Sequence, residues 1–233
     1  MPVEDKMLLI RNYDLWCNLT EDEVDTLKIE HHFIEVPKGQ YIYFEAYNLN
    51  KVYFVKEGYI KIGYIDQEGN EKIKEIIHQG ELFGQFSLER NNLHGEFAQA
   101  YKNNVSICAF TIEDFEKLLK SRPDLALKYS KQVGAKLRNI ENRLVNLLNK
   151  DVKTRLIDFL WQLVAQDIGE NTAEGFCIPN YLTHEDIASL IGSSRQTVTT
   201  MINELEMEKI LSYNRQKICF LDVKKLQKIM SLA

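Results

Sequence analysis

The stretch from His184 to Asn203 reads HEDIASLIGSSRQTVTTMIN and decides how the second half of the chain folds. Ala188 is small enough for two helices to cross closely, and Gly192 can adopt the positive φ angle of a tight turn. The larger apolar residues are spaced to bury the facing sides of two helices: Ile187, Ile191, Val198, Met201 and Ile202. The stretch therefore predicts a helix-turn-helix.

Both predicted helices begin at residues that favour a helix N-terminus. Thr183, followed three residues later by Asp186, forms a capping pair for the first helix. Ser193 or Ser194 can cap the second helix, since a serine hydroxyl accepts a hydrogen bond from an otherwise unpaired backbone N–H. Either cap places Arg195 in the first turn of the second helix.

The second helix carries polar side chains on the face opposite its apolar residues. Arg195 and Gln196 match the edges of guanine and adenine in the major groove, and the first turn is where a recognition helix meets the bases. The candidate DNA contacts on this helix are Ser194, Arg195, Gln196, Thr199, Thr200 and Asn203. Small-residue helical hairpins with a polar outer face also occur in proteins that bind no DNA, so the following segment matters.

That segment, residues 210–221, reads ILSYNRQKICFL and predicts two short strands that turn at 214–216. A strand pair directly after a helix-turn-helix is a wing. Arg215 and Lys217 lie at its turn, where basic side chains contact phosphate. The complete pattern is a much stronger indication of DNA binding than the helical hairpin alone.

The charge of the chain excludes binding to nucleic acid by general electrostatic attraction. Its 233 residues include 29 Lys and Arg and 34 Asp and Glu, a formal net charge of −5, so DNA binding must come from a local surface. Residues 151–233 contain nine Lys and Arg against eleven Asp and Glu. Glu204, Glu206 and Glu208 at the end of the second helix must therefore point away from phosphate.

Other sequence features indicate a cytoplasmic protein with no membrane contact. No apolar run reaches the ~18 residues of a membrane-spanning helix, and the N-terminus lacks the pattern of a signal peptide. The cysteines are at least 42 residues apart, whereas a zinc or iron–sulfur site shows a local pair. We interpret them as small buried hydrophobic residues in a reducing compartment, with no metal or cofactor. They are Cys17, Cys108, Cys177 and Cys219.

The first half of the chain changes pattern near residue 31. Residues 1–30 carry leucines at helical intervals, whereas residues 31–112 are rich in β-branched and aromatic residues typical of strands. Strands are expected over 41–44, 51–55, 59–64 and 72–77, with a hairpin tip at 67–70. Regular short strands separated by glycine turns are typical of a small β-barrel or roll.

Residues 112–149 return to a helical pattern with a narrow apolar seam. Its residues are 4, 3, 4 and 3 positions apart, as in a coiled coil: Val133, Leu137, Ile140, Leu144 and Leu147. The narrow seam favours a dimer interface, and a core helix packed on its own chain is the alternative. Beyond it, residues 152–164 predict a broad amphipathic helix and residues 167–179 a polar loop.

A β-roll, a long helix and a winged helix-turn-helix, in this order, resemble the CRP/FNR transcription regulators over nearly the whole chain. Residues 79–84 (QGELFG) are similar to the family's P-G-x-x-x-G turn, and 194–198 (SRQTV) to its S-R-E-T-V recognition helix. Arg195 falls on the family's guanine-reading arginine. Gln196 replaces the usual glutamate and Thr200 a second arginine, so we expect a half-site that departs from TGTGA.

The resemblance implies an α+β fold in two domains. Residues 1–149 would form a sensor domain, a double-stranded β-roll (a jelly roll like that of cyclic-nucleotide-binding domains) with a dimerisation helix at about 112–149. Residues 150–233 would form a winged helix-turn-helix domain that binds DNA.

The sensor site departs from the cAMP-binding members. Their ribose-holding acid is replaced by Gln85, and an ungapped comparison places Gly95-Glu96 where an Arg-Ser pair would hold the cyclic phosphate. A register shifted by one places His94-Gly95 there, again without an arginine. Since a carboxylate repels a phosphate, control by cAMP in the usual mode is not expected. The candidate effector pocket comprises Gly84, Gln85, Gly95, Glu96, Ile140 and Glu141, and its effector small molecule is not identified.

Two other sensor types of the family are not indicated either. Cys17 alone cannot supply the N-terminal cysteine cluster of the oxygen-sensing members. His78 and His94 are the candidate haem ligands in the roll, but lone histidines in strands and loops are more often structural. No cofactor is therefore expected.

We expect a homodimeric, sequence-specific regulator that binds a pseudo-palindromic site in double-stranded DNA, with RNA polymerase as a further candidate partner. The alternative is a ligand-binding sensor module whose winged helix mediates protein contacts, which the acidic balance of the second domain favours. The chain is not expected to be an enzyme. A metal enzyme of the cupin type needs clustered ligands, which five scattered histidines do not supply.

Overall fold

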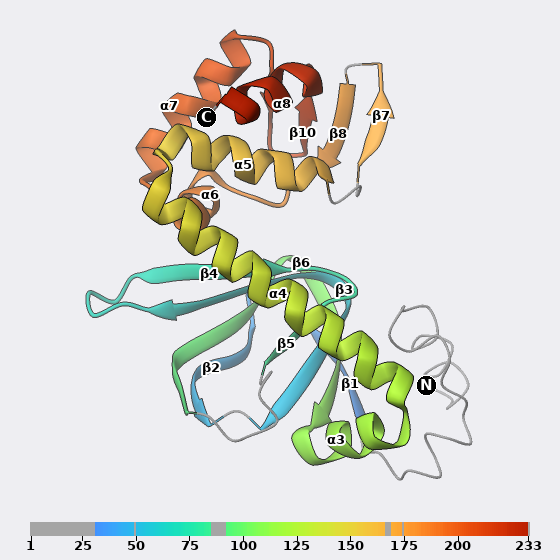
Figure 1. Ribbon diagram of the computed structural model, residues 1–233. Coiled ribbons are helices and arrows are strands. Elements are labelled where there is room, and N and C mark those ends of the chain that lie inside the picture. The colour runs from blue at the N-terminus through green and yellow to red at the C-terminus, as the bar shows by residue number, and fades with distance from the viewer. Residues whose placement is uncertain (1–30, 49, 85–91, 166–168, 174, 233) are drawn as a thin grey trace. The chain divides into compact units, whose positions relative to one another are not determined.

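The computed structural model describes residues 31–48, 50–84, 92–165, 169–173 and 175–232 (Figure 1). The expected helical region 1–30 lies outside these residues. The contacts divide the chain inside its longest helix, into compact units 1–137 and 138–233. The domain boundary expected after residue 149 stays a prediction. No helix in the described part is both long and apolar enough to cross a membrane.

The first unit is built on an antiparallel sheet in which one long strand pairs with three others. The order is β1-β6-β3-β4, with β2 pairing with β6 and β5 with β3. The strands are β1 (His31–Val36), β2 (Tyr41–Asn48), β3 (Lys51–Ile65), β4 (Glu71–Ile77), β5 (Leu82–Gly84) and β6 (Asn92–Thr111). The sheet and the helices around it confirm the expected fold class, with the β-roll first and the helix-turn-helix last.

The strands expected over 51–55 and 59–64 are one strand, β3. Gly58 interrupts the pairing with β6 by register shifts but does not end it. Its φ angle is +91°, and an added Cβ would lie 2.8 Å from the carbonyl oxygen of Asn104. A glycine in a strand pattern was therefore the sign of a bulge and not of a turn.

The hairpin tip expected at 67–70 is confirmed between β3 and β4. Asp66 Oδ1 accepts hydrogen bonds from the backbone N–H groups of Glu68 (3.0 Å) and Asn70 (2.8 Å). Gly69 has a φ angle of +82°. A side-chain-capped turn with a left-handed glycine is what this sequence favours.

The single helix expected from 112 to 149 is two helices, α3 (Ile112–Ser121) and α4 (Pro123–Asn149). Pro123 lacks an N–H and disfavours the helical conformation at Arg122, whose φ and ψ angles are −129° and 86°. The break lets Phe115 and Leu125 join the same buried cluster beside the sheet. Val133, one residue of the expected seam, is partly buried and packs against this cluster.

The second unit surrounds a four-stranded antiparallel sheet of order β7-β8-β10-β9. Its helices are α5 (Val152–Ala165), α6 (His184–Ile191), α7 (Arg195–Met207) and α8 (Val223–Leu232). Its strands are β7 (Glu170–Thr172), β8 (Gly175–Pro179), β9 (Leu211–Tyr213) and β10 (Lys217–Phe220). The core is formed by fully buried apolar residues from these helices and strands, among them Leu156, Leu160, Ile187, Val198, Ile202, Phe220 and Leu226.

The expectation of a polar loop at 167–179 was wrong, because the strands β7 and β8 lie within this segment. β8 pairs with β10, far along the chain, so its strand conformation depends on a partner that no local pattern shows. The same pairing places Cys177 directly opposite Cys219, and the two form a disulfide.

The interpretation of the cysteines therefore needs a correction. Cys177 and Cys219 are buried, as expected, but they are bonded to each other. Cys108 is free and buried in the roll, where desolvation raises the pKa of its thiol to about 12. Cys17 lies outside the described residues.

We predict that Gly63→Ala destabilises the first unit. Gly63 is buried in β3, and a Cβ there would overlap the carbonyl oxygen of Lys72 and lie 2.8 Å from the Phe97 ring. Strand backbone and a buried ring cannot yield freely, so the free energy of unfolding should fall by about 1–3 kcal/mol. Denaturation followed by far-UV circular dichroism measures this loss.

Gly134→Ala in α4 is the matched control. Among the residues that the structure describes, nothing comes within 4 Å of a Cβ added there. Alanine is the better helix former, so this variant should gain about 0.5–1 kcal/mol. Equal effects of the two substitutions would contradict the importance of the close strand approach at Gly63.

Candidate nucleic-acid interface

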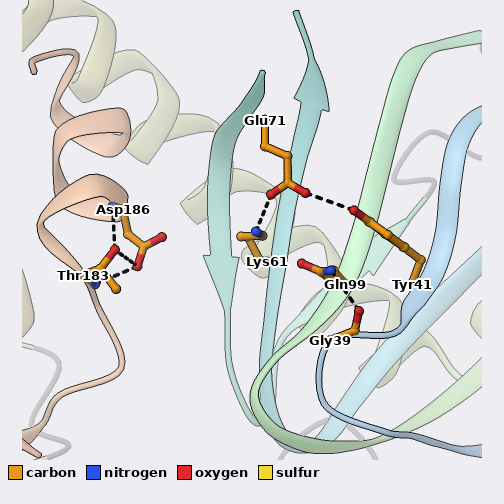
Figure 2. Close-up of polar contacts among 7 residues, drawn as sticks. All are labelled: Gly39, Tyr41, Lys61, Glu71, Gln99, Thr183 and Asp186. Carbon is orange, nitrogen blue, oxygen red and sulfur yellow. Dashed lines mark hydrogen bonds and ion pairs between the residues drawn. The ribbon is translucent and has the colours of Figure 1, made fainter. Parts of the chain in front are cut away.

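Helix α6 begins and ends as its sequence predicts. Thr183 Oγ1 accepts a hydrogen bond from Asp186 N–H at 3.1 Å, and Thr183 N–H donates to Asp186 Oδ2 at 2.6 Å, which completes the capping box (Figure 2). Gly192 ends the helix in the left-handed conformation, with φ +66° and ψ 54°. The beginning of α6 and its end at Gly192 are therefore encoded in the local sequence.

Of the two serines that could cap α7, Ser194 does so. Its Oγ accepts a hydrogen bond from Thr197 N–H at 3.1 Å, and its φ and ψ angles of −91° and 151° are those of a cap. Ser194 is exposed, as are Arg195 and Gln196 in the first helical turn. The residues expected to meet DNA first thus lie at a well-defined helix N-terminus.

Helix α7 has one buried and one exposed side. Val198, Ile202 and Leu205 are buried. The polar residues expected on the outer face are exposed at Arg195, Gln196, Thr200 and Asn203, while Thr199 is half-buried. Five of the six expected contact residues on or beside this helix are therefore freely exposed, and the sixth lies at the edge of the exposed face.

The acidic end of α7 is partly engaged within its own unit. Glu206 Oε1 accepts a hydrogen bond from the Tyr213 N–H at 2.8 Å, and Glu208 pairs with Lys225 at 3.2 Å. Two of the three glutamates thus have partners on β9 and α8. This arrangement reduces their repulsion of a phosphate backbone approaching the other end of the helix.

The wing turns at 214–216, as expected. Asn214 Oδ1 accepts hydrogen bonds from the N–H groups of Gln216 (2.8 Å) and Lys217 (2.9 Å), and Asn180 N–H donates to the Gln216 carbonyl (2.8 Å). Arg215 is exposed at the tip and Lys217 is half-buried. The turn therefore holds Arg215 outward on a fixed backbone.

Arg155 is a positioning residue that the sequence reasoning missed. From α5 it donates to the carbonyl oxygens of Ile191 (Nε, 2.8 Å) and Gly192 (Nη2, 3.1 Å), at the end of α6. It also donates to the Lys150 carbonyl (Nη1, 2.8 Å). These carbonyls have no partner within a helix, and a cation is favourable at a helix C-terminus. Only the spacing of α5 was visible in the sequence, and that spacing does not show which residue reaches the turn.

The candidate effector residues are only partly brought together. Gly84 ends β5 with a φ angle of +93°, Gly95 lies in β6 with φ +58°, and Gln85 is outside the described residues. Glu96 is buried in β6. Ile140 and Glu141 are exposed on α4, in the second compact unit.

Glu96 has two partners that the sequence reasoning missed. Its Oε1 accepts a hydrogen bond from the Tyr43 hydroxyl, and its Oε2 pairs with Lys74, each at 2.8 Å. Burial and the Glu96 charge raise the pKa of Tyr43 well above its ordinary value, so its phenol stays protonated and donates. The carboxylate expected to repel a phosphate is thus neutralised by an ammonium from β4.

A second polar cluster lies in the same unit. Glu71 accepts from the Tyr41 hydroxyl at 3.0 Å and from Lys61 at 2.5 Å, and Gln99 donates to the Gly39 carbonyl at 2.9 Å (Figure 2). His78 lies in the turn before β5, where its N–H donates to Glu81 Oε2 at 2.9 Å. The side chain of His94 is not described.

Arg155→Lys should destabilise the second unit. An ammonium cannot reproduce the fork that reaches both α6 carbonyls, and leaving the part-buried Ile191 carbonyl unpaired costs about 1–3 kcal/mol. We expect a lower melting temperature, with Lys153→Ala, an exposed position on the same helix, as the control. Equal melting temperatures for Arg155→Lys and the unmodified protein would show that the turn does not depend on these bonds.

Comparison with known proteins finds a matching family model in each of the two units. Residues 33–122 match the family model of the cyclic nucleotide-binding domain, and residues 154–229 match that of the Crp-like helix-turn-helix domain. The chain is 29% identical over 182 residues to the global nitrogen regulator of Nostoc sp., covering 78% of this chain and 81% of that protein. It is 23% identical over 188 residues to the cAMP-activated global transcriptional regulator CRP of Salmonella typhimurium, covering 80% and 88%.

Solved structures agree with these sequence matches. A CooA variant from Carboxydothermus hydrogenoformans superposes with a TM-score of 0.74 at 26% identity, covering 91% of this chain and 92% of that one. FixK2 from Bradyrhizobium japonicum, at 20% identity, shows the same fold with a TM-score of 0.72, covering 86% and 97%. The chain belongs to the CRP/FNR family of DNA-binding transcription regulators.

Proposed function

We propose that this regulator binds a pseudo-palindromic DNA site as a homodimer and reads each half-site with α7. The observation that carries the proposal is the outer face of α7: a capped N-terminus followed by exposed Arg195, Gln196, Thr200 and Asn203, above a fully buried inner face. Side chains of this kind at the start of a helix suit the major groove. Arg215 and Lys217 on the wing would contact the phosphates alongside.

An uncovered apolar stripe on α4 supports the homodimer. Leu137, Ile140 and Leu144 are each more than half exposed, and Leu147 is 41% exposed. Such a stripe at coiled-coil spacing is costly to leave in water and marks an interaction surface. A second copy of the same helix would cover it, whereas Val133 already packs within its own chain. Two-fold symmetry would then place half-site centres about one DNA turn, ~34 Å, apart.

We further propose that cAMP does not control this protein in the usual mode. Glu96 stands where the resemblance puts part of the phosphate-holding pair, and its partners Tyr43 and Lys74 already satisfy its charge. A phosphate entering there would meet a carboxylate, and Lys74 would have to leave Glu96 to bind it. The effector is not assigned.

Selection of random duplexes by the purified protein, with and without cAMP, tests the function. An enriched palindrome of equal strength in both tubes supports the proposal. Enrichment only with cAMP would contradict the proposed effector independence. No enrichment in either would favour the alternative, a sensor module whose winged helix contacts proteins, which the acidic balance of residues 151–233 favours.

Arg195→Ala should weaken binding to the enriched duplex by about 1–3 kcal/mol and relax the sequence preference at one base pair of each half-site. The reason is the loss of a bidentate contact with a guanine edge. Fluorescence anisotropy titrations against the site and its single-base variants measure both effects. A uniform loss across all sequences would instead assign Arg195 to the phosphate backbone.

Ile140→Glu should convert the dimer into monomers. Two copies of this residue would bring like charges together in an apolar seam, where carboxylates are poorly solvated. Sedimentation velocity at micromolar concentration distinguishes the two states. Leu127→Glu is the matched control, because Leu127 is 58% exposed on the same helix but lies off the seam. A monomeric unmodified protein, or dimers of both variants, would rule out the stripe as the interface.

A further inference from the structure

The hydroxyl of Thr199 is committed to contacts within the protein. Thr199 Oγ1 lies 2.8 Å from the Arg195 carbonyl oxygen, to which it donates, and 2.8 Å from His184 Nδ1. A hydroxyl has one hydrogen, and a carbonyl oxygen can only accept. Because that hydrogen goes to Arg195, the Thr199 oxygen must accept from His184, whose Nδ1 therefore carries the proton.

The surroundings of His184 agree with this assignment. Its Nε2 is buried and has no hydrogen-bond partner among the described residues, as suits an unprotonated nitrogen in the neutral ring. Burial and the nearby Arg195 charge lower the pKa of His184, with Glu206 acting in the opposite direction. The ring lies against Tyr213 with centroids 4.7 Å apart, and the Tyr213 hydroxyl donates to the Leu182 carbonyl at 2.6 Å. His184 is thus a fixed donor beneath α7.

These bonds change what Thr199 can offer to DNA. With its hydrogen donated to a carbonyl and its oxygen accepting from a histidine, it cannot donate to a phosphate or to the acceptors on a base edge. The group on Cβ that no hydrogen bond engages is the γ-methyl. Thr199 lies one helical turn from both Arg195 and Asn203, on the side of α7 that would face the bases. In the major groove, the apolar partner for a methyl group is the C5-methyl of thymine.

We propose that Thr199 reads one thymine in each half-site through methyl contact, with His184 as the positioning residue that holds its hydroxyl away from the DNA. The proposal rests on the proposed DNA binding and names a base for it. Thr200 is the natural comparison. Its hydroxyl donates to the Gln196 carbonyl at 3.1 Å. Within the described part of the chain, no contact like that of His184 engages its oxygen.

The test replaces thymines of the enriched duplex by deoxyuridine, one symmetric pair at a time, and uses the full-length protein. Uracil differs from thymine in the major groove only by the missing methyl. One thymine position should respond, with binding about four-fold weaker per half-site and about fifteen-fold weaker when both half-sites are changed. No response at any thymine would overturn the inference while leaving DNA binding intact. Failure to enrich any duplex would overturn the proposed function together with the inference.

Two substitutions separate the methyl from the hydroxyl. Thr199→Val keeps a γ-methyl and should retain the preference for thymine over uracil, whereas Thr199→Ser keeps the hydroxyl and should lose it. Thr200→Ser, the matched control, should retain it. The reverse pattern for Val and Ser would assign the contact to the hydroxyl, and loss of the preference in Thr200→Ser would assign it to Thr200. Either result overturns the inference.

The role of His184 has its own readout. His184→Ala should lower the ratio of thymine to uracil affinity, because the freed hydroxyl can turn toward the groove. His184→Asn, whose amide can donate to Thr199, should restore the ratio. A merely structural role would change the melting temperature but not this ratio, so an unchanged ratio in a folded His184→Ala protein would remove His184 from the proposal.

Discussion

Two carbonyl oxygens at the end of α6, those of Ile191 and Gly192, decide where α7 can lie. The last carbonyls of a helix lack donors within the helix, and the carbonyl of the buried Ile191 is unfavourable without one. Arg155 provides three N–H groups in a rigid fork and bonds both carbonyls from α5. Gly192 then turns the chain in a conformation that side-chain-bearing residues rarely adopt. The direction of α7, and with it the face offered to DNA, follows from this one satisfied helix end.

The exposed face of α7 carries few charges, and several polar side chains of this helix form hydrogen bonds or ion pairs within their own unit. The hydroxyls of Thr199 and Thr200 both donate to carbonyls one turn earlier, and Glu206 and Glu208 have partners elsewhere in the unit. Within an acidic chain, this leaves Arg195 as the charged group at the start of the helix. Specificity must then depend on the shape and hydrogen bonding of a few side chains, because the general attraction of a basic surface is missing.

The distance along the chain between interacting residues explains which features the sequence could predict. The caps at Thr183 and Ser194 and the Asn214 turn of the wing depend on residues within four positions of one another, so their pattern was visible. Strand β8 and the Cys177–Cys219 bond depend on a partner strand about forty residues away, and Arg155 depends on a neighbouring helix. The break at Pro123 was locally encoded, but the apolar periodicity on both sides concealed it. The partners of Glu96 come from β2 and β4, which no spacing connects.

The roll shows why family membership does not by itself specify an effector. Its core needs only apolar residues inside the strands, and these are present from Val52 to Phe110. A cation that is not already paired favours phosphate binding, whereas here the Lys74 ammonium is paired with one oxygen of Glu96 and the Tyr43 hydroxyl donates to the other. An anionic ligand would have to compete for the Lys74 ammonium with the Glu96 carboxylate, which is part of the same chain and already bound to it. A cationic ligand would in turn have to displace the Lys74 ammonium from Glu96, whereas a neutral ligand would face neither competition.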